Sequence, residues 1–189
     1  MARPSVADAR REQIIEATLQ TIAKHGISST TLDRIATTAG MSRGHVRHFV
    51  GNRDALLIDA ARWFYTVDTS APSILPEHVS TLTEALDYLF GSEFTSSTDD
   101  NAIVLGFVEL SRTSAEIAQV LSEVYLSTEQ RLLELIRSAH PAVSAQRQTD
   151  AATAVLTAAL GSVFMEDFNQ DPDRPARARR SIDGLLASL

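Results

Sequence analysis

The sequence predicts an all-α protein that opens with a three-helix helix-turn-helix domain and continues into a second helical domain. Apolar residues recur every three or four positions in nearly every segment, as they do on one face of a helix. No stretch of alternating apolar and polar residues is long enough for a strand, and clusters of Gly, Pro and Ser separate the helical segments. A length of 189 residues suits one or two domains with a sizeable core.

The first predicted helix ends at Gly26, and a short second helix follows it. Thr30 and Asp33 have the spacing of a capping box at the start of this second helix. Gly40 ends it, because glycine adopts the positive φ of a tight turn without steric cost. The apolar faces consist of Ile14, Ile15, Ala17, Leu19, Ile22 and Ala23 in the first helix and of Leu32, Ile35, Ala36 and Ala39 in the second.

Two further helices are predicted, one before Gly51 and one after it. Ser42 is a suitable N-cap for a short helix over residues 43–49, and Asn52 for a fourth helix that carries Leu56 and Leu57. A loop around Pro72 and Pro76 follows, and a flexible loop is predicted over residues 92–100. The remaining helices are expected over residues 77–90, 101–112, 115–139, 144–168 and 175–187.

Charge divides the chain after Arg53. Residues 1–53 hold eight Lys and Arg against four Asp and Glu, a net charge of +4, whereas residues 54–189 hold nine against twenty, a net charge of −11. A basic head on an acidic body is typical of a protein that binds a polyanion, although so modest an excess also arises by chance. We therefore expect a DNA-binding domain over residues 1–53 and a separate helical domain over residues 54–189.

The chain contains no cysteine, which excludes a disulfide scaffold, thiol catalysis and cysteine-ligated zinc, and which fits a reducing cytoplasm. The N-terminal residues are polar and charged and contain no apolar run, so we expect no signal peptide. The longest apolar stretch, residues 151–165, is too short to span a bilayer and predicts a buried helix. We expect a cytoplasmic protein without membrane contact.

Residues 30–49 carry the pattern of a helix-turn-helix. Ala36 is small where two helices must approach closely, and Gly40 follows four residues later in the turn. Val46 lies six residues beyond Gly40 and is expected to pack against Ile35, which fixes the crossing of the two helices.

The helix after the turn would present polar and basic side chains to a major groove. Arg43 can donate two hydrogen bonds to guanine, and His45 can contact a base edge or a phosphate. Gly44 costs about 1 kcal/mol inside a helix, and close approach of the backbone to DNA would explain it. The predicted DNA-binding residues are Thr31, Ser42, Arg43, Gly44, His45, Arg47, His48 and Arg53, of which Arg47, His48, Arg53 and Thr31 suit phosphates.

A simpler interpretation stands beside each of these assignments. Ser42 can act as a helix cap alone, Arg43 and Arg47 as solvated surface residues, and His45 as a passive neighbour. His48 can pack on the adjacent phenylalanine instead of contacting DNA.

These residues together resemble the DNA-binding domain of the TetR family of bacterial transcriptional regulators, without gaps over residues 10–58. The resemblance rests on Ile14-Ile15-Glu16-Ala17, Gly26, Thr30 to Ala36, Ala39 to Gly44, His48-Phe49 and Asn52 to Leu57. The chain departs from the family pattern at Arg47, Phe49, Val50 and Arg53, where an aromatic residue, Tyr, Phe and Lys are usual. The resemblance implies a homodimer with two three-helix heads, and a body that binds a small inducer and changes the spacing of the heads.

The C-terminal residues support a dimer independently. The helix predicted around residues 149–168 is apolar or small on nearly every side, so it must be covered on every side. The last helix, with Ile182, Leu185 and Leu186 on one side, could join it in a four-helix interface about a two-fold axis. The alternative is a monomeric bundle in which both helices are core.

A ligand pocket in the body would be lined by aromatic and large apolar residues, although each of them also suits a plain core. The predicted ligand-binding residues are Trp63, Phe64, Phe90, Phe94, Phe107, Tyr125, Phe164 and Met165. Polar residues that could orient an apolar or amphipathic ligand are Glu109, Arg112, Tyr125 and Glu166.

The sequence thus predicts a ligand-responsive DNA-binding transcriptional regulator, a homodimeric repressor that a small-molecule inducer releases from a pseudo-palindromic DNA operator. It contains no nucleophile elbow, phosphate-binding glycine loop, dinucleotide fingerprint or metal-binding histidine spacing, so we expect no enzyme, no cofactor and no metal. The alternative is a helical protein-interaction module without DNA binding.

Overall fold

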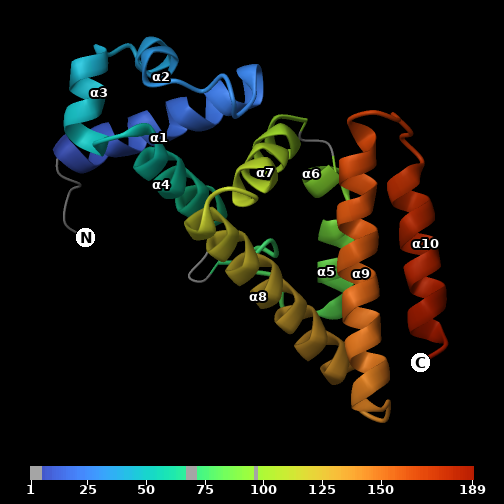
Figure 1. Ribbon diagram of the computed structural model, residues 1–189. Coiled ribbons are helices and arrows are strands. Elements are labelled where there is room, and N and C mark those ends of the chain that lie inside the picture. Colours follow the sequence, from blue (N-terminus) through green and yellow to red (C-terminus); the bar gives the residue numbers. More distant parts are fainter. Residues whose placement is uncertain (1–5, 67–71, 96–97) are drawn as a thin grey trace. The chain divides into compact units, whose positions relative to one another are not determined.

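The computed structural model describes residues 6–66, 72–95 and 98–189, and every regular element in these ranges is a helix (Figure 1). The predicted all-α fold class is confirmed there. The chain forms two compact units, one of residues 1–67 and 102–122 and the other of residues 68–101 and 123–189. Within the described ranges, no helix has the length and apolar character needed to cross a membrane.

The first unit contains the N-terminal helices and parts of two later ones. Ile14, Ile22, Ile35, Val46 and Leu57 are fully buried in it. Its helices are α1 (Val6–His25), α2 (Leu32–Thr38), α3 (Arg43–Val50), α4 (Arg53–Thr66), α7 (Thr98–Ser111) from residue 102 onward and α8 (Ala115–Ala139) as far as residue 122.

Side-chain caps start the short helices of the first unit. The predicted caps Ser42 and Asn52 are confirmed, because their side chains accept hydrogen bonds from the His45 and Ala55 amides at 3.2 and 2.9 Å. The predicted capping box of Thr30 is wrong: Thr31 is the N-cap of α2, and the buried Thr30 hydroxyl donates to the Gly26 carbonyl at the end of α1.

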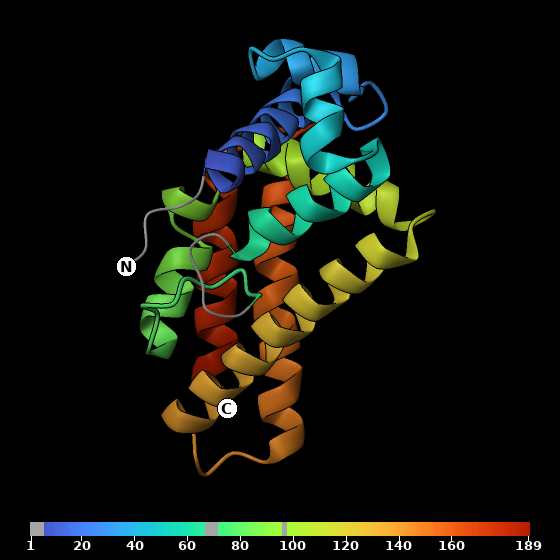
Figure 2. The same cartoon turned by 90° about the vertical axis from the view of Figure 1, so that its left-hand side faces the viewer.

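The second unit contains α5 (Leu82–Leu89), α6 (Ser92–Thr95), the start of α7, the rest of α8, α9 (Ala145–Glu166) and α10 (Arg174–Ala187). Figures 1 and 2 show α9 and α10 side by side, running in opposite directions. Its core includes Leu89, Leu132, Val155 and Ile182 from α5, α8, α9 and α10, together with Leu75 from the segment before α5.

Two predictions for the second unit need correction. Residues 77–81 do not open a helix, because Arg131 donates to the carbonyls of Leu75, Pro76 and Val79 and holds this segment in turns. A capping box of Thr81 and Glu84 then starts α5. The predicted loop over 92–100 contains α6 and the start of α7, and residues 96–97 lie outside the described ranges.

Candidate nucleic-acid interface

A tight turn connects α2 to α3 and sets the direction of α3. Gly40 has a φ of +65°, in the left-handed region that glycine favours. The Met41 amide donates to the Ala36 carbonyl at 2.9 Å, and the Gly40 amide donates to the Thr37 carbonyl at 3.2 Å. These two hydrogen bonds form a Schellman motif, which satisfies carbonyl groups that the end of α2 leaves without helical partners.

Apolar packing beneath the turn fixes the crossing of the two helices. Ile35 and Val46 are fully buried, and Ala36 is 4% exposed, as the predicted helix-turn-helix requires. Gln13 of α1 donates its side-chain amide to the Ala39 carbonyl at 2.9 Å, a contact that the sequence pattern did not predict. The helix-turn-helix prediction is confirmed in the described structure.

The outer face of α3 is basic and exposed. Arg43, His45, Arg47 and His48 are all exposed, and α3 has no acidic residue in its first turn. Their helix, α3, and the preceding helix α2 (light blue to cyan in Figure 2) form one end of the first unit. A polyanion can therefore approach this face without displacing any part of the unit.

The ring of Phe49 packs against the rings of the two histidines of α3. Its ring centroid lies 5.1 Å from that of His45 and 5.4 Å from that of His48, the latter with the rings edge to face. Phe49 is half-buried, whereas both imidazoles remain exposed. The packing of His48 on Phe49 and its contact with DNA, posed as alternatives from the sequence, are thus geometrically compatible.

Gly44 lies on the same exposed face, and nothing inside the protein requires a glycine there. Its φ is not positive, and a Cβ built on it would meet no atom within 4 Å. Glycine in an exposed helix costs about 0.5–1 kcal/mol relative to alanine. The structure leaves the side of Gly44 open to an approaching molecule.

Two hydroxyl groups flank the face at helix starts. The Thr31 and Ser42 oxygens accept hydrogen bonds from the Arg34 and His45 amides at 3.3 and 3.2 Å. Because a hydroxyl is also a donor, each O–H can still donate to a phosphate oxygen.

Arg43 has an intramolecular partner on α2. Its Nη1 lies 3.2 Å from Oδ2 of Asp33, and the two side chains are 62% and 65% exposed. This pair could not be predicted from the sequence, because the partners come from different helices and meet only through the turn.

Arg53 has a different environment from the basic residues of α3. Its Nε donates to the Thr30 carbonyl at 2.5 Å and its Nη2 to the Ile27 carbonyl at 2.7 Å, while Nη1 lies 3.5 Å from Asp54. One guanidinium thus fixes the loop between α1 and α2. The predicted contact of Arg53 with phosphate stays a prediction, and this loop-fixing role is new.

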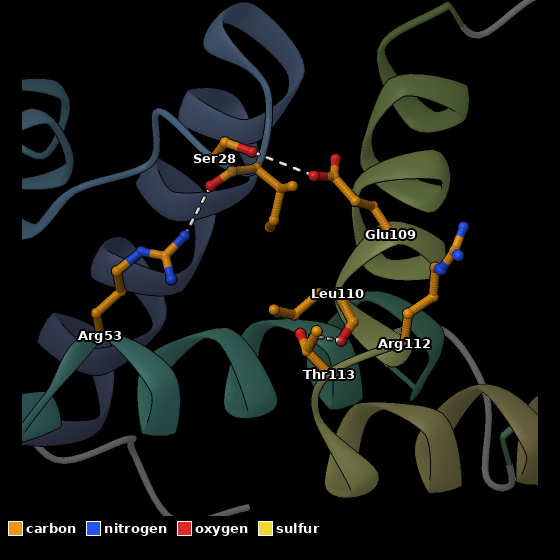
Figure 3. A pocket seen from close by; sticks show the side chains of 7 residues that line it. Ser28, Arg53, Glu109, Leu110, Arg112 and Thr113 are labelled. Carbon is orange, nitrogen blue, oxygen red and sulfur yellow. Dashed lines mark hydrogen bonds between the residues drawn. The ribbon is translucent and has the colours of Figure 1, made fainter.

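The same loop contacts α7 and borders a pocket of about 340 Å³ (Figure 3). Glu109 accepts a hydrogen bond from the Ser28 hydroxyl at 3.2 Å, and a Cβ on Gly106 would lie only 3.1 Å from Ile22 Cγ2 and 3.2 Å from Ile27 Cβ. The residues that line the pocket are Ile27, Ser28, Arg53, Glu109, Leu110, Arg112 and Thr113. Glu109 and Arg112, predicted as ligand-orienting residues, therefore share one pocket.

The predicted aromatic ligand residues fall into both units. Phe107 is fully buried and its ring lies 6.4 Å from that of Phe64, whereas Phe94 packs against the core of the second unit. The members in the first unit are Trp63, Phe64 and Phe107, and those in the second are Phe90, Phe94, Tyr125, Phe164 and Met165. Their ligand role stays a prediction.

An aromatic pair beside carboxylates distinguishes the second unit. The Tyr88 and Phe94 ring centroids lie 5.6 Å apart. Burial, together with the nearby negative charges of Glu93 and Asp100, raises the pKa of the Tyr88 hydroxyl to about 12. The surroundings of this ring are thus apolar and negatively charged.

The fold and this surface define a helix-turn-helix protein whose second helix is exposed and basic. Comparison with known proteins agrees: residues 14–60 match the model of the tetR family of bacterial regulatory proteins. Residues 14–60 of the chain are therefore similar to the N-terminal domain of this family.

Sequence relatives match the same region. The chain is 45% identical over 62 residues to the HTH-type transcriptional regulator BetI of Stenotrophomonas maltophilia, covering 33% of this chain and 32% of the relative. It is 47% identical over 53 residues to BetI 1 of Chromohalobacter salexigens, covering 28% and 26%. The matches thus span about a third of the relatives' length or less.

Solved structures share the fold over nearly the whole chain. A TetR-family transcriptional regulator from Cytophaga hutchinsonii matches with a TM-score of 0.78 and 18% identity, over 100% of this chain and 98% of that one. A transcriptional regulator from Saccharomonospora viridis, solved in complex with choline, matches with a TM-score of 0.70 and 14% identity, over 95% and 96%.

Proposed function

We propose that this protein is a DNA-binding transcriptional regulator, without enzymatic activity, that inserts α3 into the major groove. The observation that carries the proposal is the two-sided character of α3. Val46 and Val50 anchor one side in the core, while the basic residues of the other side are exposed. The tetR-family match over residues 14–60 supports it.

The positions of the side chains along α3 support a division into base contacts and phosphate contacts. Arg43, at the start of the helix, donates two hydrogen bonds to a guanine, and His45 contacts a neighbouring base edge or phosphate. Arg47 and His48 contact phosphates, together with the hydroxyls of Thr31 and Ser42. Phosphate contacts set the orientation of the helix, and base contacts give the sequence preference.

A homodimer would place two such helices on one operator. Ala154, Ala158 and Leu160 of α9 are only half-buried, and Met165 at its end is 41% exposed. Phe168, in the turn after α9, is 77% exposed, and Leu185 of α10 is 37% exposed. We propose that these apolar surfaces pack against a second copy, so that the operator is a pseudo-palindrome.

An organic cation is the proposed small-molecule effector. A quaternary ammonium ion is attracted both to aromatic faces and to carboxylates, and Tyr88, Phe94 and Glu93 offer both. Choline is the compound to test first, because a neighbour of the same fold was solved with it. Heating the protein with choline should raise its Tm, whereas the neutral isostere 3,3-dimethylbutan-1-ol should not. Equal shifts with both compounds would contradict a cation site.

We propose that the protein represses transcription and that the effector releases it from DNA, and the connectivity of the chain supports a coupling between the two units. Both α7 and α8 have one end in each unit, so a ligand that moves their ends in the second unit displaces their ends in the first. In the first unit α7 contacts the loop that precedes α2, through Glu109 and Gly106. We propose that this displacement changes the orientation of α3 and weakens DNA binding, at a coupling of about 1–3 kcal/mol.

Selection from a random duplex pool tests the proposed function. Purified protein should enrich a two-fold symmetric sequence, and its affinity should fall steeply between about 50 and 200 mM salt, as counterion release requires. The variant Arg43→Ala should lose the preference at one base pair of each half-site while still binding DNA. No enrichment and no binding at either salt concentration would favour a helical protein-interaction module instead.

A further inference from the structure

The first residue of α3 is a cation, which is electrostatically unfavourable at that end of a helix. The helix dipole places partial positive charge at the N-terminus, and α3 has no acidic residue in its first turn to offset it. The nearest compensation comes from another helix: Asp33 of α2 approaches Arg43 to 3.2 Å. Arg43 is thus held in place by a carboxylate outside its own helix.

Stability does not explain this pair. Both side chains are more than half exposed, and exposed ion pairs contribute only about 0–1 kcal/mol. A carboxylate on a DNA-facing surface also repels phosphates, so Asp33 weakens general affinity for DNA. Asp33 also lies in the first turn of α2, where the helix dipole favours a carboxylate. This effect does not require a partner on α3, so the pairing with Arg43 requires a further role.

We infer that Asp33 is a specificity-determining residue, which orients Arg43 toward a base instead of a phosphate; the inference rests on the proposed DNA-binding function. A guanidinium has five N–H donors, and the bidentate pair with guanine uses two of them. The hydrogens of Nη1 that face Asp33 can therefore stay bound to the carboxylate while Nη2 and Nε face the guanine. Asp33 positions the side chain and does not itself touch the base.

The Asp33 carboxylate also disfavours the alternative in which Arg43 binds a phosphate. A guanidinium released from Asp33 can turn to the nearest phosphate, where it gains affinity for any sequence and loses discrimination. Holding Arg43 on Asp33 removes this alternative. Neutralising Asp33 should therefore raise binding to unrelated DNA and lower the preference for the guanine.

Asp54 provides a matched control for this test. Like Asp33, it is an exposed aspartate in the first turn of a helix of the same unit, and it lies 3.5 Å from an arginine. The variants Asp33→Asn and Asp54→Asn change the net charge equally, so each should raise non-specific affinity. Their effects differ only where the partner arginine contacts a base.

The experiment measures a discrimination ratio, the dissociation constant for a modified duplex divided by that for the selected duplex. In the modified duplex, 7-deazaguanine, which lacks the N7 acceptor, replaces the guanine that Arg43 contacts. We expect Asp33→Asn to lower this ratio about three- to tenfold and Asp54→Asn to leave it unchanged. In an Arg43→Ala background, Asp33→Asn should no longer change the ratio. Circular dichroism checks folding, and Asp33→Ser replaces Asp33→Asn if the amide destabilises α2.

The outcomes separate the inference from the function on which it rests. If the wild-type chain selects no sequence, the proposed function fails. If it selects one, and Asp33→Asn and Asp54→Asn change the ratio alike, Asp33 has no role in specificity. A loss of discrimination with Asp33→Asn that persists in the Arg43→Ala background would also overturn the inference.

Discussion

Replacing Gly44 by alanine should stabilise the protein and weaken its binding to DNA. The Cβ of the alanine would meet no atom within 4 Å, so the free protein accommodates it without strain. Alanine is favoured over glycine in an exposed helix by about 0.5–1 kcal/mol. For a chain of 189 residues, such a gain corresponds to a rise in Tm of roughly 1–4 °C.

The same methyl group would stand between α3 and the groove. If the backbone at Gly44 approaches the DNA closely, the added methyl prevents that approach and misplaces the neighbouring Arg43. We expect a loss of at least about tenfold in affinity for the selected duplex, equivalent to roughly 1.4 kcal/mol. A variant that is more stable and binds less well cannot owe its defect to unfolding.

Thermal unfolding and fluorescence anisotropy with a labelled duplex measure the two effects. Gly184→Ala in α10 is the control, because a Cβ there also meets no atom within 4 Å. It should give a similar rise in Tm and unchanged affinity. If Gly44→Ala raises Tm but binds DNA as the wild type does, the glycine does not serve close approach, and if it lowers Tm, the space around it is not open.

Three further predictions concern other parts of the fold. Gly106→Ala should destabilise the first unit by about 1–3 kcal/mol in urea unfolding, because its Cβ would crowd Ile22 and Ile27 at 3.1 and 3.2 Å, and a stabilised variant would contradict this packing. Arg53→Lys should cost about 1–2 kcal/mol in the same assay, because one ammonium cannot replace the hydrogen bonds to two carbonyls; unchanged stability would show that these bonds are dispensable. Backbone and side-chain hydrogen bonds from Ser80 and then Thr81 lower the pKa of Glu84, so its stabilising effect is present above its ordinary pKa and is lost as pH falls through the lowered value. The Tm of the wild type should therefore fall more than that of Glu84→Gln on acidification below about pH 5, and parallel curves would refute the cap's contribution.

Local rules in the sequence predicted most of the N-terminal domain. The turn at Gly40, the caps Ser42 and Asn52 and the small residue at Ala36 each follow from the conformational needs of one or two residues. Such needs appear in the sequence itself, so the helix boundaries nearby were predicted within a residue or two.

Contacts between distant segments could not be predicted in this way. Arg131 prevents the predicted early start of a helix because it satisfies carbonyls more than 50 positions away. Arg53 was assigned to phosphate because it is basic, but its position beside the loop after α1 became visible only in three dimensions. Asp33 was predicted as part of a capping box with Thr30, whereas its pairing with Arg43 depends on the geometry of the turn between α2 and α3.

Photocrosslinking from α3 tests the central claim, that this helix enters the groove, most directly. The chain has no cysteine, so His45→Cys gives a single site for an azidophenacyl label, and Ser138→Cys at the exposed end of α8 in the second unit gives a control. We predict crosslinks from position 45 to bases within each half-site of the selected duplex, and none from position 138. Crosslinks from position 138 with none from position 45 would contradict the account.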